Sequence, residues 1–81
     1  MTREQLIKQA LLKSLNVGEK RALGYTQLKL KARNYAISKK YDTSIIEEIE
    51  GLKKDQIELY MKALQVEKVD VFWYQGRAWL L

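Results

Sequence analysis

Lysine and arginine side chains are the residues of this chain whose chemistry and spacing most clearly suggest a function. Five of them fall between positions 29 and 40, namely Lys29, Lys31, Arg33, Lys39 and Lys40. Long, flexible cationic side chains can contact phosphate oxygens without reading bases, so this run is a candidate phosphate-binding surface. A solvated helix face would carry the same charges. The sequence leaves both interpretations open.

One further cation, Arg77, stands apart from this run and close to the C-terminus. It follows Gln75 and Gly76, where a tight turn is expected, so it would lie at the tip of a β-hairpin. An arginine at such a tip can enter the narrow minor groove of A·T-rich DNA or contact the backbone. Alternatively, it makes a cation–π contact with Tyr74 across the turn.

The distribution of charge along the chain is more informative than its formal net charge of +5. Residues 1–41 carry ten lysines and arginines against two glutamates, a balance of +8. Residues 42–66 carry six carboxylates against three lysines, a balance of −3, and residues 67–81 are neutral in sum. A basic half suggests a polyanionic partner such as nucleic acid, or an acidic protein surface.

Catalysis and metal binding have little support in the sequence. The chain has no histidine and no cysteine, which removes the usual zinc, iron and copper ligands and the usual nucleophilic triads. Glu47, Glu48 and Glu50 are neighbours on one short segment, whereas acid–base catalysis needs carboxylates that converge from different environments. We therefore expect neither an enzyme nor a resident metal or cofactor.

Two helices are expected in the N-terminal half. Thr2 and Gln5 can form a capping box, and apolar residues then recur at helical spacing up to Leu15. Residues 16–18 (Asn-Val-Gly) predict the end of this helix, because Asn and Gly tolerate left-handed backbone, and residues 18–24 predict a loop. Residues 25–41 fit both an alternating strand pattern and a helical face. We favour a short extended segment at Tyr25 and Thr26, then a helix over about 27–40, because the run is rich in helix formers.

The C-terminal half predicts two shorter helices and a hairpin. Ser44 and Glu47 can form a second capping box, which begins a helix that ends at Glu50 before Gly51. Another helix is expected over about 54–66. Residues 69–74 predict a β-strand, residues 75–77 (Gln-Gly-Arg) its turn, and residues 78–81 the returning strand.

The two faces of the predicted hairpin are both apolar. Alternation places Val69, Val71, Trp73, Ala78 and Leu80 on the face toward the helices. It places Phe72, Tyr74 and Trp79 on the other face. An aromatic outer face requires a cover. That cover is either the N-terminal helix of the same chain or a partner surface, including a second copy, since aromatic residues are favoured at interfaces.

The order of these elements resembles a known fold family in the segment 45–81. That segment reads IIEEIEGLKKDQIELYMKALQVEKVDVFWYQGRAWLL, in which a short helix, a glycine turn, a helix and a two-stranded wing follow one another. It resembles a winged helix-turn-helix domain that carries an extra helical segment. The resemblance implies an α+β, mostly α fold with three to four helices and a C-terminal two-stranded hairpin. It covers under half of the chain.

Members of this family have two kinds of partner. Many are DNA-binding regulators, whose penultimate helix enters the major groove. Others are protein-assembly modules, such as the tandem winged helices of ESCRT-II-type sorting complexes. The segment GLKKDQIELYMKALQ with its wing is similar to the last winged helix of such a subunit. In this chain the exposed face of that helix carries Asp55, Glu58, Lys62 and Gln65. Two carboxylates facing phosphates disfavour ordinary major-groove reading.

Two hypotheses follow for a single domain over residues 1–81. The first is a small DNA-binding winged helix, a transcriptional or replication accessory protein that contacts duplex phosphates through its lysine- and arginine-rich helix, with assistance from Arg77. The second is a protein-interaction or assembly module, homodimeric or heteromeric, that uses the outer face of the hairpin. We expect a cytoplasmic protein, or a nuclear one in a eukaryote, without a signal peptide, a membrane span or a small-molecule substrate.

Overall fold

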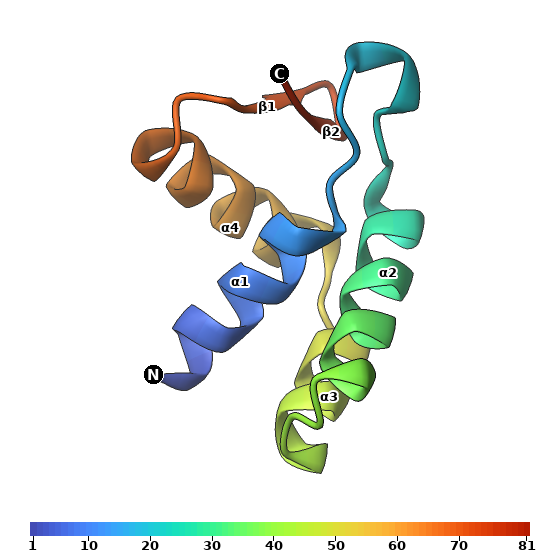
Figure 1. Cartoon of the computed structure of the whole chain (residues 1–81), viewed down its shortest axis with the longest axis vertical. Helices are drawn as coiled ribbons and strands as arrows, with labels where there is room; N and C mark the ends of the chain where they lie inside the picture. The colour runs from blue at the N-terminus through green and yellow to red at the C-terminus, as the bar shows by residue number, and fades with distance from the viewer.

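The computed structural model describes residues 1–81 as four helices followed by a two-stranded hairpin (Figure 1). The elements are α1 (Arg3–Ser14), the 3₁₀ turn η1 (Glu19–Arg21), α2 (Tyr25–Ser38), α3 (Thr43–Glu50), α4 (Lys54–Glu67), β1 (Val71–Tyr74) and β2 (Arg77–Leu80). The predicted α+β, mostly α class and its winged-helix-like order are confirmed.

One apolar core joins all four helices to the inner face of the hairpin. Its fully buried large side chains come from every layer: Ile7, Leu11, Leu28, Ile49, Ile57, Met61 and Val71. The predicted helical faces therefore point inward. Four apolar or aromatic residues of the helices lie at the margin of the core, half-buried against it, because each occupies the edge of its apolar stripe: Leu6, Tyr35, Ile46 and Tyr60.

The observed helix boundaries agree with the predicted ones at some helix ends and differ from them at others. The Thr2–Gln5 capping box at the start of α1 is confirmed. The second predicted box is wrong: Asp42 caps α3 by accepting a hydrogen bond from the backbone N–H of Ser44 at 3.4 Å. A carboxylate two residues earlier in the chain is favoured over the hydroxyl because it is a stronger acceptor at a helix N-terminus.

Helix α2 is shifted toward the N-terminus relative to the prediction. It begins at Tyr25, so the predicted extended segment at Tyr25 and Thr26 is wrong. It ends at Ser38, and Lys40 lies beyond it with a φ of 58°. The tertiary reason is the partly buried ring of Tyr25, which packs against Trp73 of the hairpin at 5.2 Å between ring centroids. This contact fixes the first turn of α2, and propensity alone does not show it.

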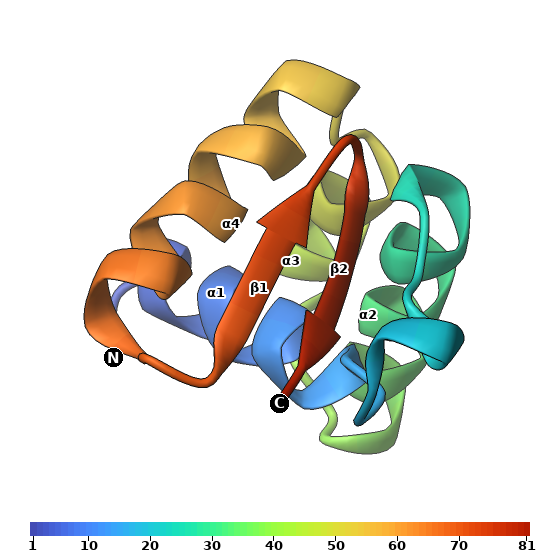
Figure 2. The ribbon, with the colours of Figure 1, turned by 90° about the horizontal axis from the view of Figure 1, so that it is seen from above.

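The connection between α1 and α2 is more ordered than a loop. Helix α1 ends at Ser14 with an extended cap, so the predicted left-handed end over 16–18 is not the helix end, although Gly18 does have a φ of 93°. The connection then pairs with β2 (Figure 2): Leu23 and Ala78 exchange two backbone hydrogen bonds of 2.9 Å. Together with the bridge between Val17 and Leu80, this pairing ties the connection to the edge of the two-stranded sheet.

The hairpin has a two-residue turn rather than the predicted three. Tyr74 pairs with Arg77, so Arg77 belongs to β2, and Gln75 and Gly76 form the turn with φ values of 50° and 75°. Two consecutive positive φ values characterise a type I′ turn, which matches the twist of the strands. The inner face predicted for the strands is confirmed, except that Val69 precedes β1 and is 93% exposed.

Candidate nucleic-acid interface

Tyr25 organises the corner of the molecule where α2, α4 and the hairpin turn meet. Its ring lies under the turn, so close that a Cβ on Gly76 would come within 2.9 Å of Tyr25 Cε2. The Nζ of Lys54, in the first turn of α4, lies 5.8 Å from the centre of the same ring. Figure 2 shows the hairpin turn beside the first turns of both α2 and α4. The start of the second helix thus fixes the wing and the expected recognition helix relative to each other.

Four cations surround this corner, and we call them the cationic corner: Lys29, Lys53, Lys54 and Arg77. They line two adjoining hollows of about 300 and 390 Å³, which share Tyr25, Thr26 and Lys54. No carboxylate lines either hollow. Asp55, in the first turn of α4, is exposed beside them but does not contribute to their walls.

Backbone groups add to the positive potential of the corner. Gly24 caps α2 without a side-chain hydrogen bond. The first N–H groups of a helix have no intrahelical acceptor, and the helix dipole places partial positive charge there. Anions bind readily at such an end when cationic side chains surround it.

Two of the four cations already have backbone carbonyls as acceptors. Arg77 Nη2 donates a 3.1 Å hydrogen bond to the carbonyl of Ala22, and Lys29 Nζ lies 3.5 Å from the carbonyl of Leu52. Neither is held in an ion pair, and Lys53 and Lys54 also have no carboxylate partner. Their charge is therefore uncompensated and can attract a phosphate backbone.

The other predicted cations do not join this corner. Lys31 Nζ donates to Asn16 Oδ1 at 3.0 Å, and Arg33 forms an ion pair with Glu50. Lys39 lies over the ring of Tyr35 at 5.7 Å, near the C-terminal end of α2. That end is about 15 Å from Lys29 along the helix axis. Figure 1 shows α3, not the hairpin, beside the C-terminal end of α2.

The predicted lysine- and arginine-rich face is therefore divided by the fold. Lys29 and Arg33 do share a side of α2, since Lys29 reaches Leu52 in the α3–α4 connection and Arg33 reaches Glu50 at the end of α3. Lys40 does not share that face, because the helix has already ended. The cation–π contact predicted for Arg77 and Tyr74 is absent, since the guanidinium bonds the Ala22 carbonyl instead.

Lys53 and Lys54 are the residues of the corner that sequence analysis did not identify. They lie in the segment 42–66, whose balance of −3 conceals them. A local signal was present: the two consecutive lysines lie at the start of the expected recognition helix, just after the Gly51-Leu52 turn. The first residues of that helix face nucleic acid in helix-turn-helix proteins.

The outer face of the hairpin does not pack on the core, although Glu19 of η1 and Ala22 line a pocket there with Tyr74 and Trp79. Phe72 and Trp79 stack on each other, with ring centroids 5.6 Å apart and planes inclined by 12°. They are half-buried but do not pack on the core, and Tyr74 is 64% exposed. Helix α1 lies on the opposite side of the sheet (Figure 2). The sequence left two possible covers for this face, and the N-terminal helix is therefore excluded as one of them.

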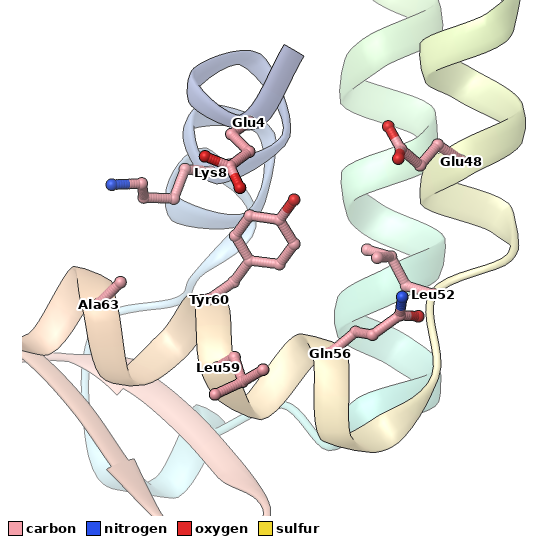
Figure 3. Close-up of a pocket in the computed structure, with 8 residues that line it drawn as sticks. All are labelled: Glu4, Lys8, Glu48, Leu52, Gln56, Leu59, Tyr60 and Ala63. Atoms are coloured by element: carbon pink, nitrogen blue, oxygen red, sulfur yellow. The ribbon is translucent and has the colours of Figure 1, made fainter. Parts of the chain in front are cut away.

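Another hollow, of about 340 Å³, lies between α1, α3 and α4, and we call it the tyrosine groove. Figure 3 shows the ring of Tyr60 at its centre, with the hydroxyl between Glu4 and Glu48. Burial raises the pKa of Tyr60 above its ordinary value, and the charges of Glu48 and then Glu4 raise this pKa further. The phenol stays protonated at neutral pH. Lys8 also lines the groove and Arg3 pairs with Glu48 at 3.2 Å, so the carboxylates here are partly balanced by cations, whereas the corner holds cations alone.

Comparison with known proteins adds no relative: no protein family, curated protein or solved structure gives a match to this chain. None of the four helices is both long and apolar enough to cross a membrane. Inference about function therefore depends on the geometry of the cationic corner and of the hairpin.

Proposed function

We propose that this protein binds the phosphate backbone of duplex DNA through the cationic corner. The observation that carries the proposal is the convergence of four uncompensated cations, from α2, the α3–α4 connection, α4 and β2, around hollows that no carboxylate lines. Phosphate contacts position a protein on DNA, whereas base-edge contacts specify sequence. The cationic corner offers phosphate contacts.

The proposed contact uses only the first turn of α4. Farther along this helix, Glu58 and Lys62 form an exposed pair at 3.2 Å, which leaves the middle of α4 without surplus positive charge. We therefore propose an accessory role in transcription or replication, with affinity from phosphates and little discrimination between sequences.

The test is a matched pair of double substitutions that remove the same charge from two places. Fluorescence anisotropy with a short blunt duplex gives the dependence of the logarithm of the binding constant on the logarithm of salt concentration. Four phosphate contacts predict a slope of about −3.6 for the wild type. Lys53→Ala with Lys54→Ala should reduce its magnitude by about two.

The control is Lys39→Ala with Lys40→Ala, which also removes two adjacent lysines but at the far end of α2. It should leave the slope nearly unchanged, because these side chains lie outside the corner. Equal losses in both double variants, or no binding of the wild type at low salt, would reject the proposal.

A second candidate, a protein-interaction module, is supported by the outer face of the hairpin, which does not pack on the core. It predicts association of the free protein with itself or with another protein through Phe72 and Trp79. Sedimentation at two concentrations tests the homodimeric form. Trp79→Ser should then reduce association while the circular dichroism of the monomer stays native.

A further inference from the structure

A small pocket separates the hairpin from the 3₁₀ turn, on the side of the sheet away from the core. Its volume is about 250 Å³, and its walls are formed by Glu19, Ala22, Tyr74, Gln75, Arg77 and Trp79. Two aromatic rings, one guanidinium and one carboxylate thus face a single space. This combination fits neither a phosphate nor an apolar side chain.

The carboxylate determines what chemistry the pocket can accept. Glu19 forms no ion pair in the structure, so its oxygens remain free acceptors. A phosphate would be repelled by it. The exocyclic amine of a nucleobase suits it well, because Glu and Asp accept hydrogen bonds from cytosine N4.

The rings and the guanidinium complete the same set of contacts. Tyr74 and Trp79 present flat apolar surfaces, on which unpaired bases stack without regard to sequence. Arg77 is held by the Ala22 carbonyl through Nη2, which leaves its other N–H groups free to donate to base or backbone acceptors.

The pocket is also continuous with the cationic corner. Arg77 and Ala22 line both this pocket and one hollow of the corner. A strand that leaves a duplex bound at the corner can therefore pass Arg77 and reach the pocket directly. A base inside a duplex cannot stack there, since it is already stacked between its neighbours.

We infer that the pocket between the hairpin and η1 receives an unpaired nucleobase, so that the preferred ligand is DNA with a junction between duplex and single strand. This inference rests on the proposed function, because the corner holds the duplex part. The carboxylate of Glu19 favours bases with an exocyclic amine over thymine. Stacking on one or two rings strengthens binding by about tenfold or more relative to a blunt duplex.

The experiment compares anisotropy titrations of the full chain with a blunt duplex and with the same duplex carrying a short cytosine extension, at the 3′ or the 5′ ends. The extension of one polarity should bind about tenfold more tightly. Tyr74→Ala and Trp79→Ala should remove this gain and leave blunt-duplex affinity within about twofold. Tyr74 is 64% exposed, so its variant folds even if Trp79→Ala does not.

Two further readouts distinguish base binding from a structural effect. In a Trp73→Phe background Trp79 is the only tryptophan, and its fluorescence should be quenched by the extended duplex but not by the blunt one. Glu19→Gln should retain quenching and abolish the preference for a cytosine over a thymine extension.

The outcomes separate the two proposals. If neither ligand binds at low salt, the proposed function fails. If the blunt duplex binds with the expected salt slope but the extension adds nothing and Trp79 is not quenched, only the present inference is overturned. It is also overturned if the free protein self-associates through Tyr74 and Trp79 and the extension adds no affinity, because the face then serves a second copy of the chain.

Discussion

Two neighbouring surfaces bordered by α4, the cationic corner and the tyrosine groove, are similar in construction but differ in charge. Each is built around a half-buried tyrosine, Tyr25 or Tyr60, and Leu52 contributes to the walls of both. The corner surrounds its ring with four cations. The groove mixes carboxylates and cations: Glu4, Glu48 and Lys8 line it, and Arg3 pairs with Glu48. Burial, and then the charges of Glu48 and Glu4, raise the pKa of Tyr60.

The difference shows that surface charge here is set by packing rather than by position in the chain. Helix α4 belongs to the acidic segment of the sequence, yet its first turn contributes Lys54 to the corner. Glu4 belongs to the basic segment, yet it brings a carboxylate to the groove. Surfaces of different charge can therefore lie on either side of one helix.

The largest effects should come from removing the two rings. Tyr25→Ala and Tyr60→Ala should each lower the free energy of unfolding by about 2–3 kcal/mol, below the cost of a fully buried ring. Urea unfolding measures this loss. Only Tyr25→Ala should also weaken duplex binding, because the ring fixes the wing against α4. If both variants weaken binding equally after correction for the unfolded fraction, the two surfaces are not independent.

A smaller effect is expected from charge introduced at the N-terminus of α2. Gly24 has an ordinary φ of −82° and open space around its Cα. Gly24→Ser and Gly24→Asp should both supply the missing cap and stabilise the fold by about 0.5 kcal/mol.

The two substitutions should differ in binding. Asp places a carboxylate in the corner and should reduce the magnitude of the salt slope by about one, whereas Ser should not. Measured stability separates this effect from any change in folding. Equal binding by the two variants would show that phosphates do not approach the start of α2.

Protein stability at alkaline pH tests the environment of Tyr60 in the tyrosine groove. The pKa of Tyr60 is raised above 10.0 in the folded protein, so the unfolded chain loses this proton first. The raised pKa of Tyr60 leaves the free energy of unfolding unaffected below pH 10 and lowers it as pH rises further. The reason is that the folded state then binds more protons than the unfolded state.

Tyr60→Phe removes this titration and should make the fall in melting temperature above pH 10 less steep. The expected change is smaller than that of ring removal, since the phenol is only half-buried. Duplex binding at neutral pH should not change. An unaltered alkaline profile would contradict the burial and the neighbouring carboxylates described for Tyr60.

The sequence predicts the helices and the hairpin better than it predicts the corner. Helical periodicity locates α1, α3 and α4 to within a few residues, because their apolar stripes are local properties. Alternation and Gly76 locate the hairpin and its faces. The start of α2 at Tyr25 depends on a contact with Trp73, 48 positions later in the chain, and local patterns do not contain it.

The candidate site is less predictable for the same reason. Lys29 and Arg77 were identified by their charge, but their grouping with Lys53 and Lys54 requires the tertiary fold. Conversely, Lys31 and Arg33 satisfied the same pattern as Lys29, and the fold turns them to Asn16 and Glu50. A charge pattern shows which residues are available, and packing decides which of them act together.

The smallest expected effect concerns the turn that rests on Tyr25. Gln75 has a φ of 50°, a conformation in which Asn is more favourable than Gln, and Asn-Gly is the preferred pair of a type I′ turn. Gln75→Asn should therefore raise the free energy of unfolding by a few tenths of a kcal/mol.

The same chemical change at an exposed helical position provides the matched control. Gln65 lies on the exposed side of α4, where Asn is a poorer helix former, so Gln65→Asn should lower the free energy of unfolding by a few tenths of a kcal/mol. Changes of opposite sign in the free energy of unfolding, measured with urea, would show that the corner depends on turn geometry and that α4 depends on helical propensity. A loss in both variants would mean that Gln75 contributes contacts beyond its backbone conformation, and the wing would then need its own side chains to hold its position over Tyr25.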